Sequence, residues 1–506
     1  MDKPRETPLS ILLFSAALVA ATLTARAVRA EPPILRLAME REPATLDWHA
    51  AQTEEDRYLI SFFMRGLLKY DGSGTPVCDL CSSYETKNNG TKYVFRLRAD
   101  TRWSDGVELE ASHFVDAFKR LLDPKNRFPA SGDFSMILGP SGARSAIRAT
   151  SAQTLEFELS NPSALFPHLL TSVAAFPIRR EIRPGKAHAT QAVLGPYFLG
   201  DWERGKKIVI EGNPEFSGIR PVYRVDFFVG SHPEQVEKYR HGRVDILPNP
   251  STEDLLQLQP RNLVVSSYWS SRVLSFNLKS PQSKNPALRR AILRALDRES
   301  LPAVLKNGEK RTTGLIPPGI PGYRELPLVS ADPAIAKTER ARLGGTPITL
   351  TLIAEDRRPN HLVVQWLQDR LKVLDLRVDA RLLAVAEFKK IMRSGAYDVA
   401  LQTHTLSLAT PVELLKTWTG IHPGYDSLFE SFLKETRPDE SQKNLDRMTQ
   451  IAETEEVLAI PLGFPTQPFL LGPRVNRFGM TPFGDPDLVK IELKSGTPST
   501  NSEMSR

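Results

Sequence analysis

Apolar and polar residues follow two different periods along the chain, and the mixture predicts an α/β protein. Runs that predict strands are found at 34–39, 93–98, 154–159, 208–210, 224–229, 244–247, 273–278, 348–353, 376–382 and 397–401, and 93–98 and 154–159 show the period-two alternation typical of strands. Helical spacing predicts helices at 54–68, at 112–122 with Ser112 as N-cap, and at 233–241, 286–296, 361–374, 411–418 and 439–454. Strands and helices that alternate in this way are typical of mixed sheets covered by helices.

The chain of 506 residues is too long for one ordinary core, so we expect two or three domains. The pattern divides into blocks that begin near 177 and near 268, and 40 prolines favour loops and strand edges over long helices. We find no internal repeat.

The first thirty residues predict a cleavable signal peptide. Lys3 and Arg5 precede an uncharged, mostly apolar run at 9–25, and Ala27 and Ala30 close the small-residue patterns that typify cleavage. The run is shorter than the roughly 20 residues that span a bilayer comfortably, so a membrane anchor is disfavoured. Because no cysteine lies near either cleavage position, we expect a protein that is free in a periplasm and carries no lipid.

Charge adds little to this interpretation. The formal net charge of +7 falls to about +5 without the first thirty residues, and no long basic run suggests a nucleic-acid surface. With 41% hydrophobic and 25% charged residues, the composition is that of an ordinary globular protein.

The chain has two cysteines, Cys78 and Cys81. In an oxidising compartment they could form a local disulfide, and inert thiols or a redox pair are the alternatives. Two cysteines alone cannot complete a structural zinc site, which needs four ligands.

Motifs for catalysis are missing from the sequence. The nine histidines form no helical His-x-x-x-His pair, and there is no Gly-x-Ser-x-Gly elbow, Walker loop or Rossmann glycine triplet. His404 and His422 could bind a metal or a carboxylate, but a packed histidine is the simpler interpretation. We therefore expect no enzyme activity, no cofactor and no metal site.

Several short motifs together resemble one family, the family 5 extracellular solute-binding proteins, which are the oligopeptide- and dipeptide-binding components of ABC importers. The motifs that carry the resemblance, in chain order, are Thr45-Leu46-Asp47, Arg65-Gly66-Leu67-Leu68, the strand 93–98, Trp103-Ser104-Asp105-Gly106, His113-Phe114-Val115, Gly195-Pro196-Tyr197, Gly242-Arg243-Val244-Asp245, and Arg289-Arg290-Ala291-Ile292 with Leu296-Asp297-Arg298. Each is modest evidence, whereas all of them in the family's order are strong evidence.

The resemblance implies a periplasmic-binding-protein-like fold of type II, cluster C: two lobes that close about a hinge, with an extra domain on lobe I. It divides the chain into a signal peptide (1–30), lobe I (31–64), the extra domain (65–177), lobe I again (178–267), lobe II (268–467) and a last segment of lobe I (468–506). Trp103 and the turn at Asp105-Gly106 are expected to serve packing.

The resemblance also implies a function: capture of a peptide or a peptide-like ligand, in a monomer that delivers it to an inner-membrane ABC permease with its ATPase subunits. In the family an acid in a segment after the 397–401 strand holds the ligand's ammonium group. Here Ser407 occupies that position and His404 replaces a tryptophan, with Thr405 between them.

A serine hydroxyl cannot neutralise an ammonium group, so either the ligand has no free α-ammonium at this point or another acid substitutes. Glu355 and Asp356 are the acids expected by analogy, and Arg357 and Arg358 in the same loop could meet a carboxylate. By position in the resemblance, the residues also expected to line the cleft are Gln52, Tyr268, Arg272 and Phe464.

Two other classes of function stay open. One is a binder of a non-peptide solute, such as a metal chelate, a sugar or a cell-wall fragment, or a ligand-sensing periplasmic protein. The more distant one is a periplasmic hydrolase or chaperone, for which the residue pattern offers no support.

Overall fold

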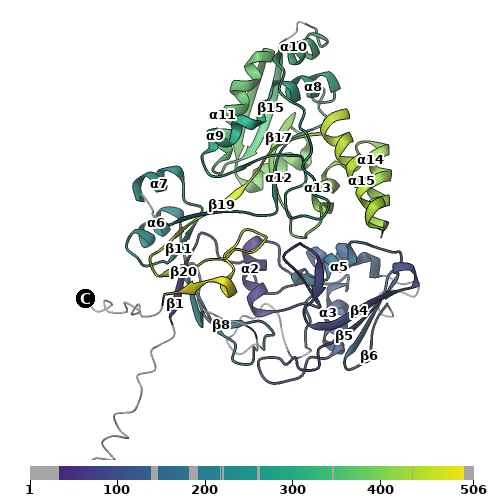
Figure 1. Ribbon diagram of the computed structural model, residues 1–506, viewed down its shortest axis with the longest axis vertical. Coiled ribbons are helices and arrows are strands. Elements are labelled where there is room, and N and C mark those ends of the chain that lie inside the picture. The colour runs from purple at the N-terminus through teal and green to yellow at the C-terminus, as the bar shows by residue number, and fades with distance from the viewer. Residues whose placement is uncertain are drawn as a thin grey trace, which may run out of the picture.

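The computed structural model describes residues 33–137, 146–179, 181, 192–216, 218, 222–258, 262–344, 347–435 and 437–494. The predicted signal peptide lies outside these residues. Three larger sheets organise the described chain, and we name its parts after them: lobe I on a seven-stranded sheet, lobe II on a six-stranded sheet and the extra domain on a four-stranded sheet. Lobe II stands above the other two parts in Figure 1.

Lobe I draws its sheet from three separate stretches of the chain. The strand order is β12 (Leu263–Ser267), β19 (Thr466–Leu471), β11 (Ile246–Pro248), β1 (Ile34–Met39), β10 (Arg224–Val229), β9 (Lys207–Gly212) and β8 (Tyr197–Glu203). Its helices are α2 (Glu54–Phe63), α6 (His232–Arg240) and α7 (Thr252–Leu258). A hairpin of β20 (Val475–Arg477) and β21 (Glu492–Leu493) ends the described chain.

One buried carboxylate joins these stretches. Asp245, in the Gly242–Asp245 motif, accepts hydrogen bonds from the Arg36 guanidinium at 2.9 and 3.2 Å and from Arg474 Nη1 at 3.1 Å. The side chain of Asp245 is only 2% exposed, so this arrangement pairs a desolvated charge with two cations. The motif therefore serves the assembly of lobe I.

The extra domain is a four-stranded antiparallel sheet with short helices. The strand order is β4 (Cys81–Lys87), β5 (Lys92–Leu97), β7 (Thr154–Glu158) and β6 (Ile147–Ser151), with helices α3 (Ala111–Leu121) and α5 (Phe166–Leu169) and the hairpin β2 (Leu68–Tyr70) to β3 (Pro76–Cys78). Cys78 and Cys81 are joined in a disulfide at the start of β4.

The Trp103–Gly106 motif is structural, as the sequence predicts. Trp103 is fully buried, and the Arg179 guanidinium lies 5.2 Å from its ring centroid. Arg179 also donates to both oxygens of Asp105, at 3.0 and 2.6 Å. Gly106 has φ +83°, a conformation that glycine adopts without strain. The motif thus forms a turn that Arg179 holds against the buried ring of Trp103.

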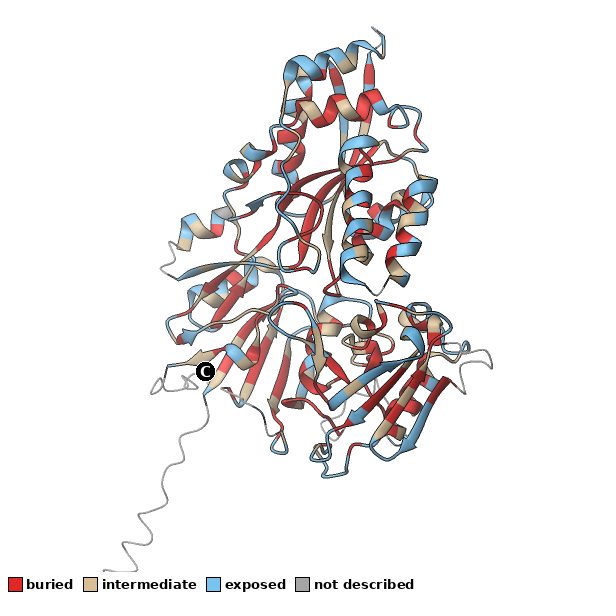
Figure 2. Ribbon diagram, turned by 45° about the vertical axis from the view of Figure 1, so that its right-hand side comes forward, coloured by how far each residue is buried: buried red, intermediate tan, exposed pale blue. Residues whose placement is uncertain are grey.

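Lobe II has a mixed sheet covered on both faces. The strand order is β14 (Lys310–Arg311), β18 (Ala459–Phe464), β13 (Ser270–Phe276), β17 (Val399–Thr405), β15 (Ile348–Glu355) and β16 (Leu376–Leu383). Its helices are α8 (Pro286–Ala295), α9 (Leu301–Leu305), α10 (Pro333–Ala341), α11 (Asn360–Leu371), α12 (Val385–Ser394), α13 (Val412–Leu415), α14 (Pro423–Lys434) and α15 (Pro438–Gln450). Figure 2 shows buried residues along the strands and exposed residues on the outer turns of the helices.

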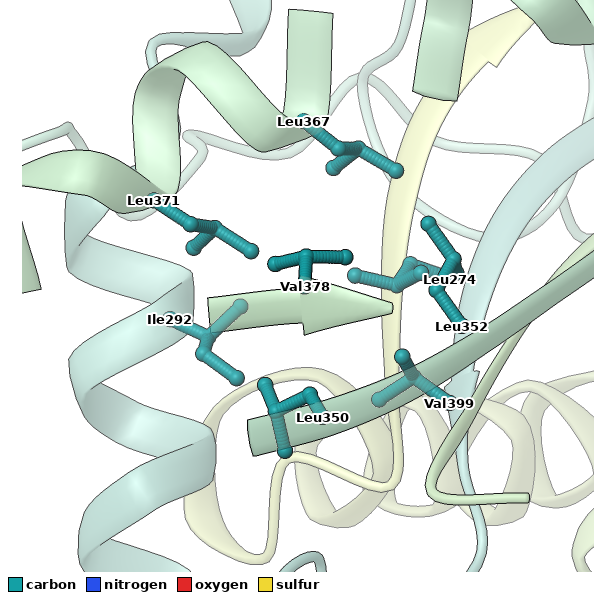
Figure 3. A pocket seen from close by; sticks show the side chains of 8 residues that line it. All are labelled: Leu274, Ile292, Leu350, Leu352, Leu367, Leu371, Val378 and Val399. Carbon is teal, nitrogen blue, oxygen red and sulfur yellow. The ribbon is translucent and has the colours of Figure 1, made fainter. Parts of the chain in front are cut away.

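The core of lobe II is close-packed where α8 and α11 meet the sheet. Figure 3 shows Ile292, Leu367 and Leu371 converging on side chains from four strands. The gap that they leave is about 10 Å³ and is lined only by aliphatic side chains. A space of this size holds at most one water molecule and offers it no polar partner, so it is part of the core.

The loop before α2 is held by one carboxylate at the start of that helix. Asp56 accepts hydrogen bonds from the backbone N–H groups of Ala44, Thr45, Gln52 and Thr53, at 2.7 to 3.1 Å. Burial favours the neutral acid, but these donors outweigh it and hold the pKa of Asp56 below its ordinary value. Asp56 therefore fixes the segment that carries the Thr45–Asp47 motif.

Several element boundaries differ by a few residues from the sequence prediction, and two of these differences have a clear local cause. The helix predicted from 112 begins at Ala111, and its N-cap is Glu110 rather than Ser112. The reason is that the Glu110 side chain accepts from the backbone of His113, whose ring in turn accepts from the Glu110 N–H. The helix predicted at 54–68 ends at Phe63, because Met64 adopts an extended conformation.

Asp56→Asn should lower the free energy of unfolding by about 2 kcal/mol at pH 7, because an amide nitrogen would face backbone donors. Asp56 has a lowered pKa, so its stabilisation is complete above the unfolded pKa of about 3.9 and is lost as pH falls through the folded pKa. Urea unfolding at pH 7 and pH 3 checks this: the gap between wild type and variant should shrink at pH 3. Glu85→Gln, which removes an exposed pair with Lys87 in the extra domain, is the control.

Candidate ligand-binding site

The chain passes between the lobes on two strand pairs. β12 leads into β13 between Ser267 and Ser270, and β18 leads into β19 between Phe464 and Thr466. In each lobe the two strands are antiparallel partners, so a ladder continues from one sheet into the other. The sequence-based boundaries, at 267/268 and 467/468, lie beside these crossings. Such a pair of connections permits the lobes to rotate about it as rigid bodies.

The Glu413 carboxylate lies beside Ser407, the serine that the sequence predicts in place of the family's acid. The Ser407 N–H donates to Glu413 Oε2 at 2.7 Å, and the Ser407 hydroxyl bonds Oε1 of the same carboxylate. Glu413 lies in the first turn of α13, six residues after Ser407. Ser407 and Glu413 together therefore present the negative charge that serine alone lacks.

Charged groups of lobe I and of the extra domain affect the pKa of Glu413, which belongs to lobe II. Burial raises its pKa, while the bonds from Ser407 and the positive charge of Arg57 lower it and Asp133 raises it further. Arg57 belongs to α2 of lobe I, and Asp133 belongs to a 3₁₀ segment of the extra domain, Pro129–Ile137. The Glu413 residue is nevertheless exposed, so its carboxylate is accessible to a ligand from solvent.

A second carboxylate lies at the hinge. Burial raises the pKa of Asp485 to about 8, and the neighbouring Glu54 and Glu55 raise it too, whereas Arg57 lowers it. Burial also raises the pKa of Tyr268, which is influenced by charges from both lobes, including Glu54. The first turn of α2, the loop at 481–487 and the hinge strand therefore face one polar region.

The four residues predicted as ligand contacts in the loop after β15, Glu355 to Arg358, have different partners in the structure. Arg357 Nε bonds Glu355 Oε2 at 3.0 Å, and Asp356 bonds His361 at 2.7 Å. The positive charge of Arg357 lowers the pKa of Tyr268, which places Arg357 near the hinge. Glu355 and Asp356 thus already have cationic or histidine partners, and Arg357 is the cation of this loop beside the cleft.

Arg358 reaches across to lobe I. Its Nη1 lies 3.1 Å from His232 Nε2 and 3.9 Å from Asp254 Oδ2. His232 itself contacts Glu40 at 2.7 Å and Asp254 at 2.8 Å. The sequence predicts that Arg358 can meet a ligand carboxylate; in this structure its partners are side chains of the opposite lobe.

Arg272 is committed to the interior of lobe II. Its guanidinium pairs with Glu309 at 2.8 and 2.9 Å and donates to Asn360 Oδ1 at 2.9 Å. Arg272 and Glu309 are 2% and 4% exposed. The predicted role of Arg272 in lining the cleft is therefore less favoured than that of a buried ion pair beside the hinge.

The remaining predicted residues scatter around the hinge. Gln52 is exposed in the loop before α2, Phe464 is buried at the crossing, and Thr405 is half-buried opposite Ser270. His404 is also half-buried; burial lowers its pKa to about 4, and its Nε2 has no hydrogen-bond partner among the described residues.

The described residues contain neither a candidate metal site nor a candidate membrane-spanning helix. They contain no group of three or more histidine, cysteine, aspartate or glutamate side chains placed to hold a metal ion. None of their helices combines the length and the apolar character that crossing a membrane requires.

Sequence reasoning missed Glu413, Arg57, Asp133 and Asp485. Glu413 carried a usable signal, because Pro411 starts a helical turn and a turn brings a residue back toward the segment before it. The other three carried none, since their meeting depends on how lobe I and the extra domain face lobe II.

Two lobes joined by a pair of antiparallel strand crossings define the class of hinged solute-binding proteins. The chain belongs to the bacterial extracellular solute-binding proteins of family 5, whose model matches residues 75–425, more than half of its length. The fold is accordingly the two-lobed α/β fold of this family.

Individual relatives are distant. The probable D,D-dipeptide-binding periplasmic protein DdpA of Escherichia coli K12 is 27% identical over 424 residues, or 77% of this chain and 79% of the relative. The probable deoxycholate-binding periplasmic protein YgiS of the same organism is 25% identical over 332 residues, and the match spans 62% of each protein.

A solved structure supports the fold. NikA from Brucella suis in complex with Fe(III)-EDTA superposes with a TM-score of 0.80 at 18% identity, covering 91% of this chain and 100% of NikA. Because these relatives are named for different solutes, the ligand has to be inferred from the residues of this site.

Arg358→Ala should shift the ligand-free protein toward more open lobes by about 1.4- to 5-fold in population, since an exposed ionic contact contributes about 0.2 to 1 kcal/mol. Single-molecule fluorescence between dyes on the two lobes measures the distribution. Arg381→Ala, which removes an exposed pair within lobe II, is the control. Identical distributions for wild type and Arg358→Ala would exclude a role in closure.

Proposed function

We propose that the protein is a periplasmic solute-binding protein that holds a peptide or a peptide-like ligand between its lobes and delivers it to an ABC permease. It acts as a monomer and makes or breaks no bond of its ligand. Membership of the family and the hinge between two polar-faced lobes support this proposal.

The observation that carries the proposal is the pairing of Ser407 with Glu413. Peptides have a terminal ammonium group, and a carboxylate in a partly desolvated recess is the group best suited to bind it. Glu413 lies where both lobes and the extra domain contribute charge. We assign to it the role for which Glu355 and Asp356 are the candidates from the sequence, because Glu355 pairs with Arg357 and Asp356 with His361 of α11.

The opposite end of a peptide requires a cation. Arg357 is half-exposed and its charge lowers the pKa of Tyr268 at the hinge, and the charge of Arg57 lowers the pKa of both Glu413 and Asp485. An arginine can hold a carboxylate through two parallel N–H donors. We assign the ligand's carboxylate to Arg357 or Arg57, and the site thereby offers both charges that a free peptide needs.

Glu413→Gln should weaken binding of free-amine tripeptides by about 10- to 100-fold, because it removes a charge-assisted hydrogen bond of about 1.5 to 3 kcal/mol. Isothermal titration calorimetry with trialanine and N-acetyl-trialanine measures the effect. Glu430→Gln, an exposed acid of α14 that pairs only weakly with Lys434, is the matched control.

The acetylated peptide supplies the second half of this test. In wild type it should bind more weakly than trialanine, and Glu413→Gln should remove the difference. Equal affinity of the two peptides for wild type would show that no ammonium group is recognised at Glu413. Because burial raises the pKa of Glu413, trialanine affinity should also fall as pH is lowered, at a higher pH than for an ordinary glutamate.

A further inference from the structure

A cavity separates the extra domain from lobe II beside the Glu413 site. Its volume is about 230 Å³, and it is lined by Ala164, Leu165, His168, Pro321, Gly322, Ala409, Thr410, Pro411, Val412, Phe432, Leu433, Pro438, Ser441, Gln442 and Leu445. In Figure 1 the elements that carry these residues, α5 below and α13 to α15 above, face one another across the two parts of the molecule.

The wall of this cavity carries no acidic or basic side chain apart from His168. Burial lowers the pKa of His168 to about 4, so its ring is neutral in a periplasm. The other polar groups of the wall are the hydroxyls of Thr410 and Ser441 and the amide of Gln442. A mainly apolar wall with a few neutral polar groups suits an uncharged occupant.

Two contacts that involve residues of the cavity wall join the extra domain to lobe II. The Ala164 N–H donates to the Leu433 carbonyl at 3.3 Å. Gly74 of the extra domain approaches Ala409 so closely that an added Cβ would lie 3.1 Å from the Ala409 Cβ, and its φ is +79°. Since the walls come from both parts, the cavity exists only while they are together.

The cavity adjoins the site that binds the ammonium group. Val412 lines it, and Glu413 is the next residue. The Tyr70 hydroxyl contacts His168 Nδ1 at 3.2 Å, and the charge of Glu413 contributes to the raised pKa of Tyr70. Tyr70 therefore contacts the cavity wall through His168 and is close enough to Glu413 to be affected by its charge, which agrees with the adjacency of Val412 and Glu413 in placing the carboxylate beside the cavity.

Its size limits what it can hold. An engineered apolar cavity of about 150 Å³ binds benzene, whereas sites for whole ligands usually run from about 300 to 1,000 Å³. About 230 Å³ is thus enough for one aliphatic or aromatic group and too little for a complete peptide.

We propose that this cavity is a subsite that takes an uncharged, mainly apolar side chain of the ligand whose ammonium group binds Glu413. The proposal rests on the function proposed above. It adds that the extra domain takes part in selecting the ligand, and that filling the subsite favours the closed arrangement in which its walls meet.

The test compares trialanine with its three single-leucine versions by titration calorimetry. At least one leucine peptide should bind wild type five times more tightly than trialanine or better. Ser441→Leu from lobe II and Ala164→Leu from the extra domain fill the cavity from opposite walls, and each should reduce that ratio below twofold. Gln450→Leu, an exposed position on the same helix α15, should keep the ratio.

Other outcomes separate this proposal from the function on which it rests. Glu413→Gln should weaken all four peptides while it preserves the leucine ratio. If trialanine binds but no leucine peptide gains, or if both filling variants fold and keep the ratio, the subsite is refuted and the proposed function stands. If no peptide of the panel binds wild type, both are refuted.

Discussion

Three side chains far apart in the sequence, Arg36, Asp245 and Arg474, determine whether this molecule has a first lobe at all. Lobe I is made of stretches that are separated by the extra domain and by lobe II, and the buried Asp245 carboxylate binds an arginine from each of the other two. Removing either partner would leave a charge in a desolvated position, which costs far more than the loss of an exposed pair. The hinge depends on this arrangement, because β12 and β19 enter lobe II from the sheet that it secures.

The family's motifs mostly serve this architecture. Asp245 assembles lobe I, Trp103 with Asp105 and Arg179 closes a turn, and Asp47 pairs with Arg120 of α3 at 2.9 and 2.5 Å to join lobe I to the extra domain. Such residues specify the scaffold, whereas the ligand is selected by side chains for which no motif exists. The sequence therefore identifies the family, but it does not identify the solute that this protein binds.

Ser407 and Glu413 show how a hydroxyl and a carboxylate that are close in sequence can form one polar unit. Glu413 lies six residues after Ser407 in the first turn of α13, and the Ser407 N–H donates to its carboxylate. The carboxylate is then held from one side and open on the other. A recess formed in this way can extend toward the extra domain, where the uncharged cavity lies.

The sequence by itself determined the alternation of strands and helices, the three blocks and the family, because periodicity and turn residues act over a few neighbours. It also predicted the polar loop after β15. Only the tertiary structure decided that Arg358 contacts His232 of the other lobe, that Arg272 is paired with Glu309, and that Arg57 and Asp133 face Glu413. The physical reason is that an electrostatic partner is chosen by distance in space, and the distances between lobes are set by two strand crossings rather than by any local pattern.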